Sequence, residues 1–239
     1  MNRPGCVSRL LAHPARLLVV GFAATILIGG TLLALPVATW DGRSIGVIDA
    51  LFMATSAVCV TGLAVLDPGG VFNGFGQGVL LGLVQIGGLG ITTLSTTLLL
   101  LVGQEVSFSS QDAVQGSFTL NQRVGLGSLL RQVLLWALTI EALGAVILFL
   151  TESQRLPLGQ ALWVSVFHAV SAFCNAGFAL RPDNLKADRA VAGIVLPISL
   201  LIILGGLGFA VLAELAYWAS RRWRGHRAFL SLHTKVALT

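Results

Sequence analysis

Charged residues are scarce in this chain. Asp, Glu, Lys and Arg make up only 10% of its 239 residues, whereas 55% are hydrophobic. A soluble globular domain carries about 25% charged residues, so this chain has too few to cover a surface exposed to water. The scarcity excludes a soluble protein. It predicts an all-α polytopic membrane protein, because helices satisfy their own backbone polar groups in lipid.

The chain also lacks the sequence patterns of enzymes and metal sites. It contains no HxxxH, no CxxC and no carboxylate-rich cluster, and nothing resembles a Walker loop or a nucleophile elbow. Three cysteines, Cys6, Cys59 and Cys174, do not suggest a disulfide framework. We therefore expect no enzymatic activity and no cofactor.

Apolar runs alternate between long and short along the chain. A long run can cross the ~30 Å of hydrocarbon in a bilayer, whereas a run of about 13 residues is too short and is typical of a re-entrant segment. The long runs are residues 17–35, 76–102, 133–150 and 190–220, and the short runs are residues 45–57 and 158–172. The first run also suits a secretory signal peptide, but it is long for one, and we interpret it as a retained span.

This order predicts two units of span, short pore helix, loop and span. The units cover residues 17–102 and 129–220. A cytoplasmic N-terminus (1–16), a cytoplasmic connection (103–128) and a basic tail that begins a truncated third unit (221–239) complete the chain.

Positive charge predicts the orientation of these units. The termini and the central connection carry ten Lys and Arg residues near the spans: Arg3, Arg9, Arg16, Arg123, Arg131, Arg221, Arg222, Arg224, Arg227 and Lys235. The opposite side carries five: Arg43, Arg155, Arg181, Lys186 and Arg189. The positive-inside rule therefore predicts a multi-pass plasma (inner) membrane protein with both termini in the cytoplasm. The basic tail directly follows a span, so we interpret it as an interfacial anchor and expect no nucleic-acid partner.

A short word occurs twice in the chain. Ser56-Ala-Val-Cys-Val-Thr-Gly62 recurs as Ser171-Ala-Phe-Cys-Asn-Ala-Gly177, 115 residues later, and each copy follows a short apolar run. A Gly-Gly-Leu-Gly word follows each copy, at residues 87–90 and 205–208. Two nearly equal offsets indicate a duplicated structural unit. Cys59 and Cys174 hold matching positions, which favours small loop residues over a disulfide between them.

The duplicated word suits a backbone that binds cations. Non-helical backbone at membrane depth must be buried in protein or line a wet cavity, and rows of carbonyls can replace the hydration shell of a cation. The candidate filter residues are Cys59, Val60, Thr61 and Gly62 in one copy and Cys174, Asn175, Ala176 and Gly177 in the other. We expect the Asn175 side chain to brace its loop. An anion pathway would favour basic residues, and neither copy contains one.

Small residues also mediate ordinary helix packing in membranes. Tight contacts within a bundle are therefore the alternative for both copies of the word. The same alternative applies to the glycines that we interpret as flexible or closely packed points below the loops: Gly87, Gly88, Gly90, Gly205, Gly206 and Gly208. Asp49 is expected to cap the first short helix. Glu141 is expected to face protein rather than lipid, and His168 is expected to pack in the second short helix.

These stretches resemble the Trk/Ktr/HKT superfamily of potassium and sodium uptake proteins. The resemblance rests on residues 54–63, 85–90 and 167–178, with residues 230–235 similar to the start of the family's third unit. It implies a potassium-channel-like pore in which Gly62 and Gly177 are the key filter glycines, and potassium (or sodium) is the transported ion. The chain would supply two of four units, so it would be truncated or two chains would pair as a homodimer. A cytosolic nucleotide-binding regulatory subunit is the partner that the resemblance implies, beside the lipid bilayer.

Two other functions compete with potassium uptake. A secondary solute carrier with discontinuous helices would often have inverted repeats, whereas the two copies here share one orientation. A non-conducting fragment or scaffold is the other alternative, because two units cannot close a four-fold pore alone.

Overall fold

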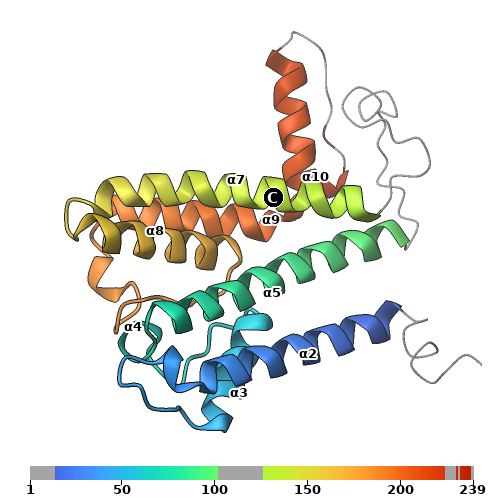
Figure 1. The fold of residues 1–239 in the computed structure, drawn as a ribbon. Coiled ribbons are helices and arrows are strands. Elements are labelled where there is room, and N and C mark those ends of the chain that lie inside the picture. The colour runs from blue at the N-terminus through green and yellow to red at the C-terminus, as the bar shows by residue number, and fades with distance from the viewer. Residues whose placement is uncertain (1–13, 102–125, 224–229, 231, 238–239) are drawn as a thin grey trace, which may run out of the picture. The chain divides into compact units, whose positions relative to one another are not determined.

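The computed structural model describes residues 14–101, 126–223, 230 and 232–237, which form helices joined by loops (Figure 1). In this part of the chain the only strand-like pairing is an isolated bridge between Thr39 and Phe72. The all-α class predicted from composition is confirmed for these residues. Most of the predicted cytoplasmic N-terminus and of the connection 103–128, part of the basic tail, and Cys6 lie outside them.

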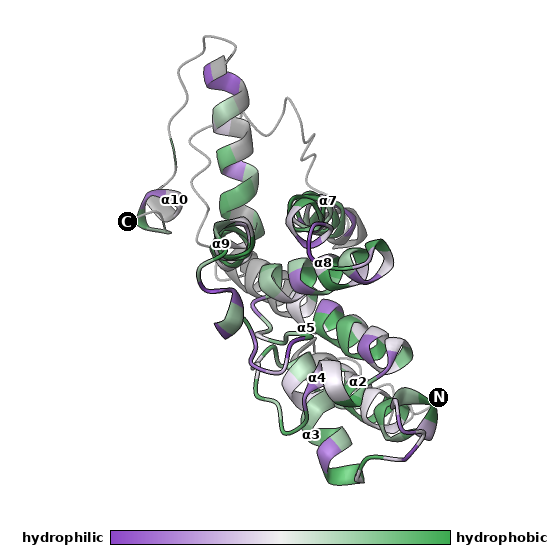
Figure 2. Cartoon of the chain, turned by 90° about the vertical axis from the view of Figure 1, so that its left-hand side faces the viewer, coloured by the Kyte–Doolittle hydropathy of each residue, from purple (hydrophilic) through white to green (hydrophobic). Residues whose placement is uncertain are grey.

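The long helices coincide with the long apolar runs. They are α2 (Pro14–Ala34), α5 (Gly74–Leu101), α7 (Leu126–Glu152) and α9 (Ala192–Trp223), and Figure 2 colours them by the hydropathy of each residue. Even the shortest, α2 with 21 residues, is about 31 Å long at 1.5 Å per residue. The apolar runs therefore predict where the long helices lie, although α9 contains Pro197 and a break at Gly208.

Two stretches within the described residues are both long and apolar enough to cross a membrane, Arg131–Glu152 in α7 and Ala192–Phe209 in α9. The apolar stretches of α2 and α5 with described side chains, Val19–Ala34 and Gly74–Gly90, are shorter. Helices α7 and α9 thus agree with the predicted membrane protein, and crossing by α2 and α5 stays a prediction.

The shorter helices occupy the places of the short apolar runs and of the loops. Helices α3 (Val47–Val58) and α8 (Leu158–Phe173) match the two predicted pore helices within two residues. The remaining elements are η1 (Pro36–Ala38), α4 (Pro68–Val71), η2 (Lys186–Asp188) and α10 (Leu232–Ala237).

Side chains satisfy the free backbone amides at two helix starts. The Asn73 Oδ1 atom accepts hydrogen bonds from the amides of Phe75 (3.0 Å) and Gly76 (3.2 Å) at the start of α5. The Asp67 carboxylate likewise accepts from Gly69 and Gly70, both at 3.1 Å, at the start of α4. Such caps remove the cost of unpaired N–H groups.

The predicted cap at α3 is wrong. Gly46 is the N-cap residue, and no side chain bonds to the helix start there. Asp49 lies in the first turn, three residues beyond the N-cap. Its charge still lies near the positive end of the helix dipole, where the sequence analysis expected an acidic residue.

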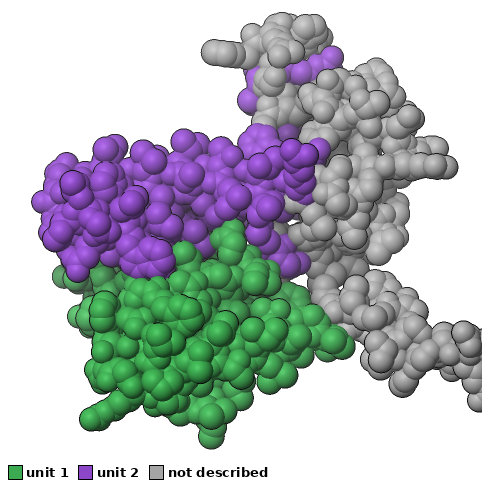
Figure 3. All heavy atoms as spheres, in the orientation of Figure 1, with its two compact units in different colours: residues 1–88, 174–195 green, residues 89–173, 196–239 purple. Residues whose placement is uncertain are grey.

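The described chain divides into two compact units, drawn in different colours in Figure 3. Unit 1 comprises residues 1–88 and 174–195, and unit 2 comprises residues 89–173 and 196–239. Unit 1 therefore combines the first copy of the duplicated word with the second copy's loop.

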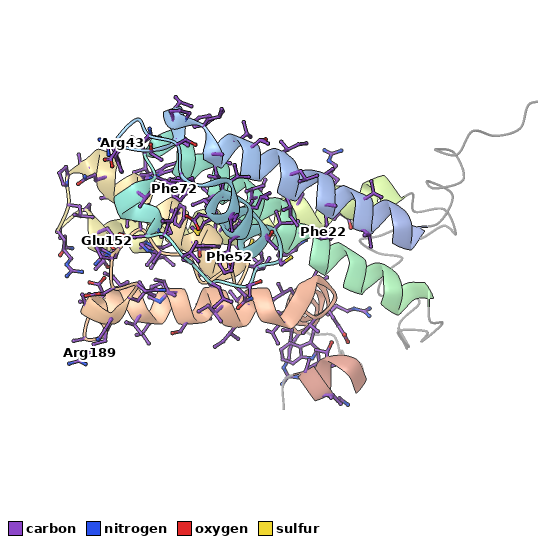
Figure 4. The ribbon with its side chains drawn as sticks, turned by 90° about the horizontal axis from the view of Figure 1, so that it is seen from below. Phe22, Arg43, Phe52, Phe72, Glu152 and Arg189 are labelled. Carbon is purple, nitrogen blue, oxygen red and sulfur yellow. The ribbon has the colours of Figure 1, made fainter. Side chains whose placement is uncertain are left out.

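In unit 1, helix α2 packs along α3. Gly30 permits this close packing, since a Cβ atom there would lie 2.8 Å from the Leu51 side chain of α3. Gly29 permits a second close approach, because its Cβ atom would lie 2.6 Å from the Leu83 methyl groups of α5. Phe72, which is fully buried, lies among these helices (Figure 4). Arg43 and Arg189, two of the arginines on the predicted outer side, are exposed and lie toward the same end of the view in Figure 4.

In unit 2, helix α7 packs against α8 with one face. The buried positions of α7 recur every three or four residues, which is the helical period: Val133, Ala137, Glu141, Ala145, Leu148 and Glu152. Glu141 is only 3% exposed, which confirms that it faces protein. His168 is also buried, with its ring at the edge of the Phe167 ring and a centroid distance of 6.3 Å.

We predict opposite effects for two alanine substitutions in α5. A Cβ atom at Gly87 would overlap the Val58 carbonyl oxygen at the end of α3, whereas one at Gly82 would meet nothing within 4 Å. Gly87→Ala should lower the free energy of unfolding by about 1–3 kcal/mol, since backbone must shift. Gly82→Ala should raise it by about 0.5–1 kcal/mol, since alanine loses less entropy in a helix.

Thermal unfolding of the purified protein in detergent checks this pair. The two variants differ only in what the added methyl group meets. Equal midpoints for Gly87→Ala and Gly82→Ala would contradict the close contact between α5 and the end of α3.

Candidate functional site

The first copy of the duplicated word forms a tight turn at the end of α3, and we call residues Cys59–Gly62 the first loop. The Cys59 amide still donates to the Thr55 carbonyl at 2.8 Å, as in a helix. The next two amides turn back instead, from Val60 to Ala57 O (3.2 Å) and from Thr61 to Ser56 O (2.9 Å). The helix end thus holds the loop through its own carbonyls, which would otherwise lack partners.

The second copy, residues Cys174–Gly177, follows the end of α8, and we call it the second loop. Its backbone φ angles have the same pattern of positive values as those of the first loop. Val60 and Asn175, at matching positions, have φ of 54° and 59°, and Gly62 and Gly177 have φ of 78° and 73°. Thr61 and Ala176, between them, are not among the residues with positive φ. The duplicated word therefore specifies a duplicated backbone conformation.

The residues at positive φ differ in how well they tolerate it. Glycine has no Cβ atom to clash, and asparagine adopts this region more readily than most residues. Val60 is β-branched, for which a positive φ is unusual and strained. The hydrogen bonds of the Val60 and Thr61 amides to the α3 carbonyls hold it there.

The two loops meet at their glycines, both of which belong to unit 1. A Cβ atom on Gly62 would lie 2.8 Å from the Ala176 carbonyl oxygen and 3.2 Å from the Gly177 Cα atom. One on Gly177 would lie 3.2 Å from the Gly62 Cα atom. Backbone thus contacts backbone, and each glycine is needed both for its φ and for its missing side chain.

Helix α5 supports the two loops with neighbouring glycines. Gly87 contacts the Val58 carbonyl, which precedes the first loop, and a Cβ atom on Gly88 would lie 2.7 Å from Cys174 Sγ in the second loop. Both glycines are buried. Their close approach supports the interpretation as closely packed points below the loops.

The remaining predicted glycines lie in helices, with one exception. Gly90, Gly205 and Gly206 are helical. Gly208 has φ 77° and ψ 158°, which breaks α9 into two helical segments, and a Cβ atom there would meet nothing within 4 Å. Only glycine readily adopts these angles, so the break occurs where the sequence places its last inner glycine.

The residues of the two loops differ in exposure. Cys59, Thr61, Asn175 and Gly177 are exposed, and Ala176 is buried. Cys59 and Cys174 form no disulfide with each other. Within the part of the chain that the structure describes, no group of three His, Cys, Asp or Glu side chains could hold a metal ion.

A second contact between backbones lies farther along the chain from both loops. A Cβ atom on Gly69 would overlap the Leu180 carbonyl oxygen. The Trp40 indole donates to the Gly69 carbonyl at 3.3 Å. These residues are all in unit 1, so the segments that follow the two loops also meet.

Sequence reasoning missed Asn184, which bonds to the last residue of the second loop, and the ion pair near it. The Asn184 side-chain amide donates to the Gly177 carbonyl at 3.2 Å, and Asn184 itself has a φ of 56°. Asp188 is fully buried and pairs with Arg181. These residues lie in a charged stretch that reads as an exposed loop, and only the tolerance of asparagine for positive φ could have singled out Asn184.

Comparisons with known proteins agree with the resemblance. The family TrkH, described as "Cation transport protein", matches residues 12–238. Potassium/sodium uptake protein NtpJ of Enterococcus hirae is 39% identical over 227 residues, which cover 95% of this chain and 49% of that protein. Ktr system potassium uptake protein B of Bacillus subtilis is 40% identical over 226 residues, again 95% and 49%.

A further relative has the same coverage pattern. Ktr system potassium uptake protein B of Vibrio alginolyticus is 38% identical over 223 residues, 93% of this chain and 48% of that protein. The chain thus spans about half the length of the curated relatives it matches. With a family match over nearly its whole length and this level of identity, the chain belongs to the TrkH family of cation transport proteins.

Proposed function

We propose that this chain forms half of a plasma-membrane pore for potassium uptake, with the first and second loops as two of its four filter segments. One observation carries the proposal: loops from two sequence repeats share one backbone conformation and meet glycine to glycine. The names of the relatives, which are potassium or potassium/sodium uptake proteins, support the same ion class.

The backbone conformation supports a lining role for carbonyls. In an extended strand, successive carbonyls point to opposite sides. Residues that alternate between positive and negative φ, as at Val60, Thr61 and Gly62, can turn successive carbonyls toward one side. A row of such oxygens can replace the water around a potassium ion.

Charge favours a cation over an anion. The loops follow the C-terminal ends of α3 and α8, which have 12 and 16 residues, and a helix carries a partial negative charge at that end. No Lys or Arg occurs in either helix or either loop. An anion pore would instead favour helix N-termini or basic side chains.

The half-pore needs partners to work. Two units cannot enclose a four-fold pore, so we propose that two chains pair as a homodimer when the chain acts alone. Both termini would lie in the cytoplasm, where a nucleotide-binding regulatory subunit would dock. The charge asymmetry of the sequence and the family resemblance support these partners.

Serine substitutions at the two filter glycines should impair potassium uptake. In a bacterium deficient in potassium uptake, expression of the chain should restore growth at low potassium. Gly62→Ser and Gly177→Ser should each reduce uptake by about tenfold, because a side chain is strained at positive φ by roughly 1–2 kcal/mol. Gly62→Ser should be the more damaging, since its Cβ atom would meet a backbone oxygen at 2.8 Å. Gly74→Ser, with nothing within 4 Å of its Cβ atom, is the matched control.

Failure of the unsubstituted chain to restore growth would refute transport by this chain alone. The filter assignment has its own test in a chimera, in which the chain replaces the matching half of the Bacillus subtilis relative. If that chimera takes up potassium equally well with and without Gly62→Ser and Gly177→Ser, the two loops are not filter segments.

Val60→Asn should stabilise the first loop and preserve potassium uptake. Asparagine already occupies the matching position 175 at nearly the same φ, and it relieves the strain of a β-branched residue by about 1 kcal/mol. Thermal unfolding should show a higher midpoint for Val60→Asn, with uptake unchanged. Thr61→Asn, at a neighbouring residue without positive φ, should bring no such gain; equal midpoints for the two variants would contradict the strain at Val60.

A further inference from the structure

The second loop has a brace that the first loop lacks. The Asn184 Nδ2 atom donates to the carbonyl of Gly177, the last residue of the second loop, at 3.2 Å. The position that matches Asn184 in the first repeat, 115 residues earlier, is Gly69, which has no side chain to donate. The two repeats therefore share a loop conformation but differ in what holds the outer end of the loop.

A closed turn holds Asn184 in place. Its amide donates to the Arg181 carbonyl at 3.0 Å, and its φ of 56° completes a tight turn. The Arg181 guanidinium pairs with the Asp188 carboxylate. This ion pair joins the two ends of the segment 181–188, which contains Asn184, and closes it into a ring. Asp188 is fully buried, and a buried carboxylate is stable only with its partner, so the ring is a fixed part of unit 1.

The ring explains how the exposed hydrogen bond from Asn184 can restrict the Gly177 carbonyl. Asn184 itself is exposed, and water competes for its amide. Because the ring already fixes its backbone, little further freedom is lost when the side chain bonds to the Gly177 carbonyl. The bond then limits how far that carbonyl can rotate.

We propose that Asn184 is a positioning residue that holds the Gly177 carbonyl and thereby favours potassium over sodium. This inference rests on the proposed filter role of the second loop. A carbonyl that Asn184 holds back stays at the distance that suits the larger potassium ion. A free carbonyl can turn further inward and suit the smaller sodium ion.

Separate uptake of potassium and sodium tests the role of Asn184. The full chain is expressed in a bacterium deficient in potassium uptake, and both ions are measured in the same cells. Asn184→Gly keeps the freedom to adopt positive φ and removes only the donor. The ratio of potassium to sodium uptake should fall by about threefold to tenfold, the usual worth of one hydrogen bond.

Two further variants separate positioning from folding. Asn184→Asp has nearly the same shape but places an acceptor against the Gly177 carbonyl, and it should lower the ratio at least as far. If Asn184→Gly does not reach the membrane, the ratio measured for Asn184→Asp tests the positioning role. Asp183→Asn changes the charge one residue away, at an exposed side chain, and should leave the ratio unchanged.

Each outcome bears on the proposal. A purely structural role for Asn184 would reduce the uptake of both ions in proportion, and an unchanged ratio in Asn184→Gly and Asn184→Asp would overturn the inference. If Gly177→Ser alters the ratio while the Asn184 variants do not, the filter role stands and only the positioning role fails. If the unsubstituted chain takes up no potassium, transport by this chain alone fails, and the same Asn184 variants are compared in the chimera with the Bacillus subtilis relative, where an unchanged ratio overturns the inference.

Discussion

Where Gly62 and Gly177 meet, neither residue has room for a side chain, and both have a backbone conformation that other residues enter at a cost. This contact constrains the helices next to the two loops. Helices α3 and α8 must end just before it, and α5 must approach closely enough that Gly87 and Gly88 contact the residues around the loops. The small residues of the duplicated word and of α5 are thus explained by one constraint, the approach of backbone to backbone.

The apolar composition raises the cost of every unpaired polar group in this chain. The structure pairs the irregular backbone locally. The turn amides of the first loop bond to α3 carbonyls, Asn73 caps α5, and Asn184 holds the second loop. Such pairing stabilises the loop conformation on which the proposed ion binding depends.

Sequence reasoning located the helices well and their ends less well. Apolar run length is a strong signal in a membrane protein, and the long and short runs coincide with α2, α3, α5, α7, α8 and α9. The capping residue of α3 was misjudged, because glycine and aspartate both suit a helix start, and the N-cap is Gly46 rather than Asp49. The duplicated word likewise identified the loops, because a repeat of this kind records equivalent structure.

The sequence by itself determined the class, the helices and the equivalence of the two loops, since these depend on local hydrophobicity and on the recurrence of a word. Only the tertiary structure decided that Gly62 and Gly177 contact each other, that Gly69 contacts Leu180 and that Asn184 reaches Gly177. These contacts join segments that are far apart in the chain or that depend on the path of a loop. Local sequence patterns carry no information about which distant backbones meet.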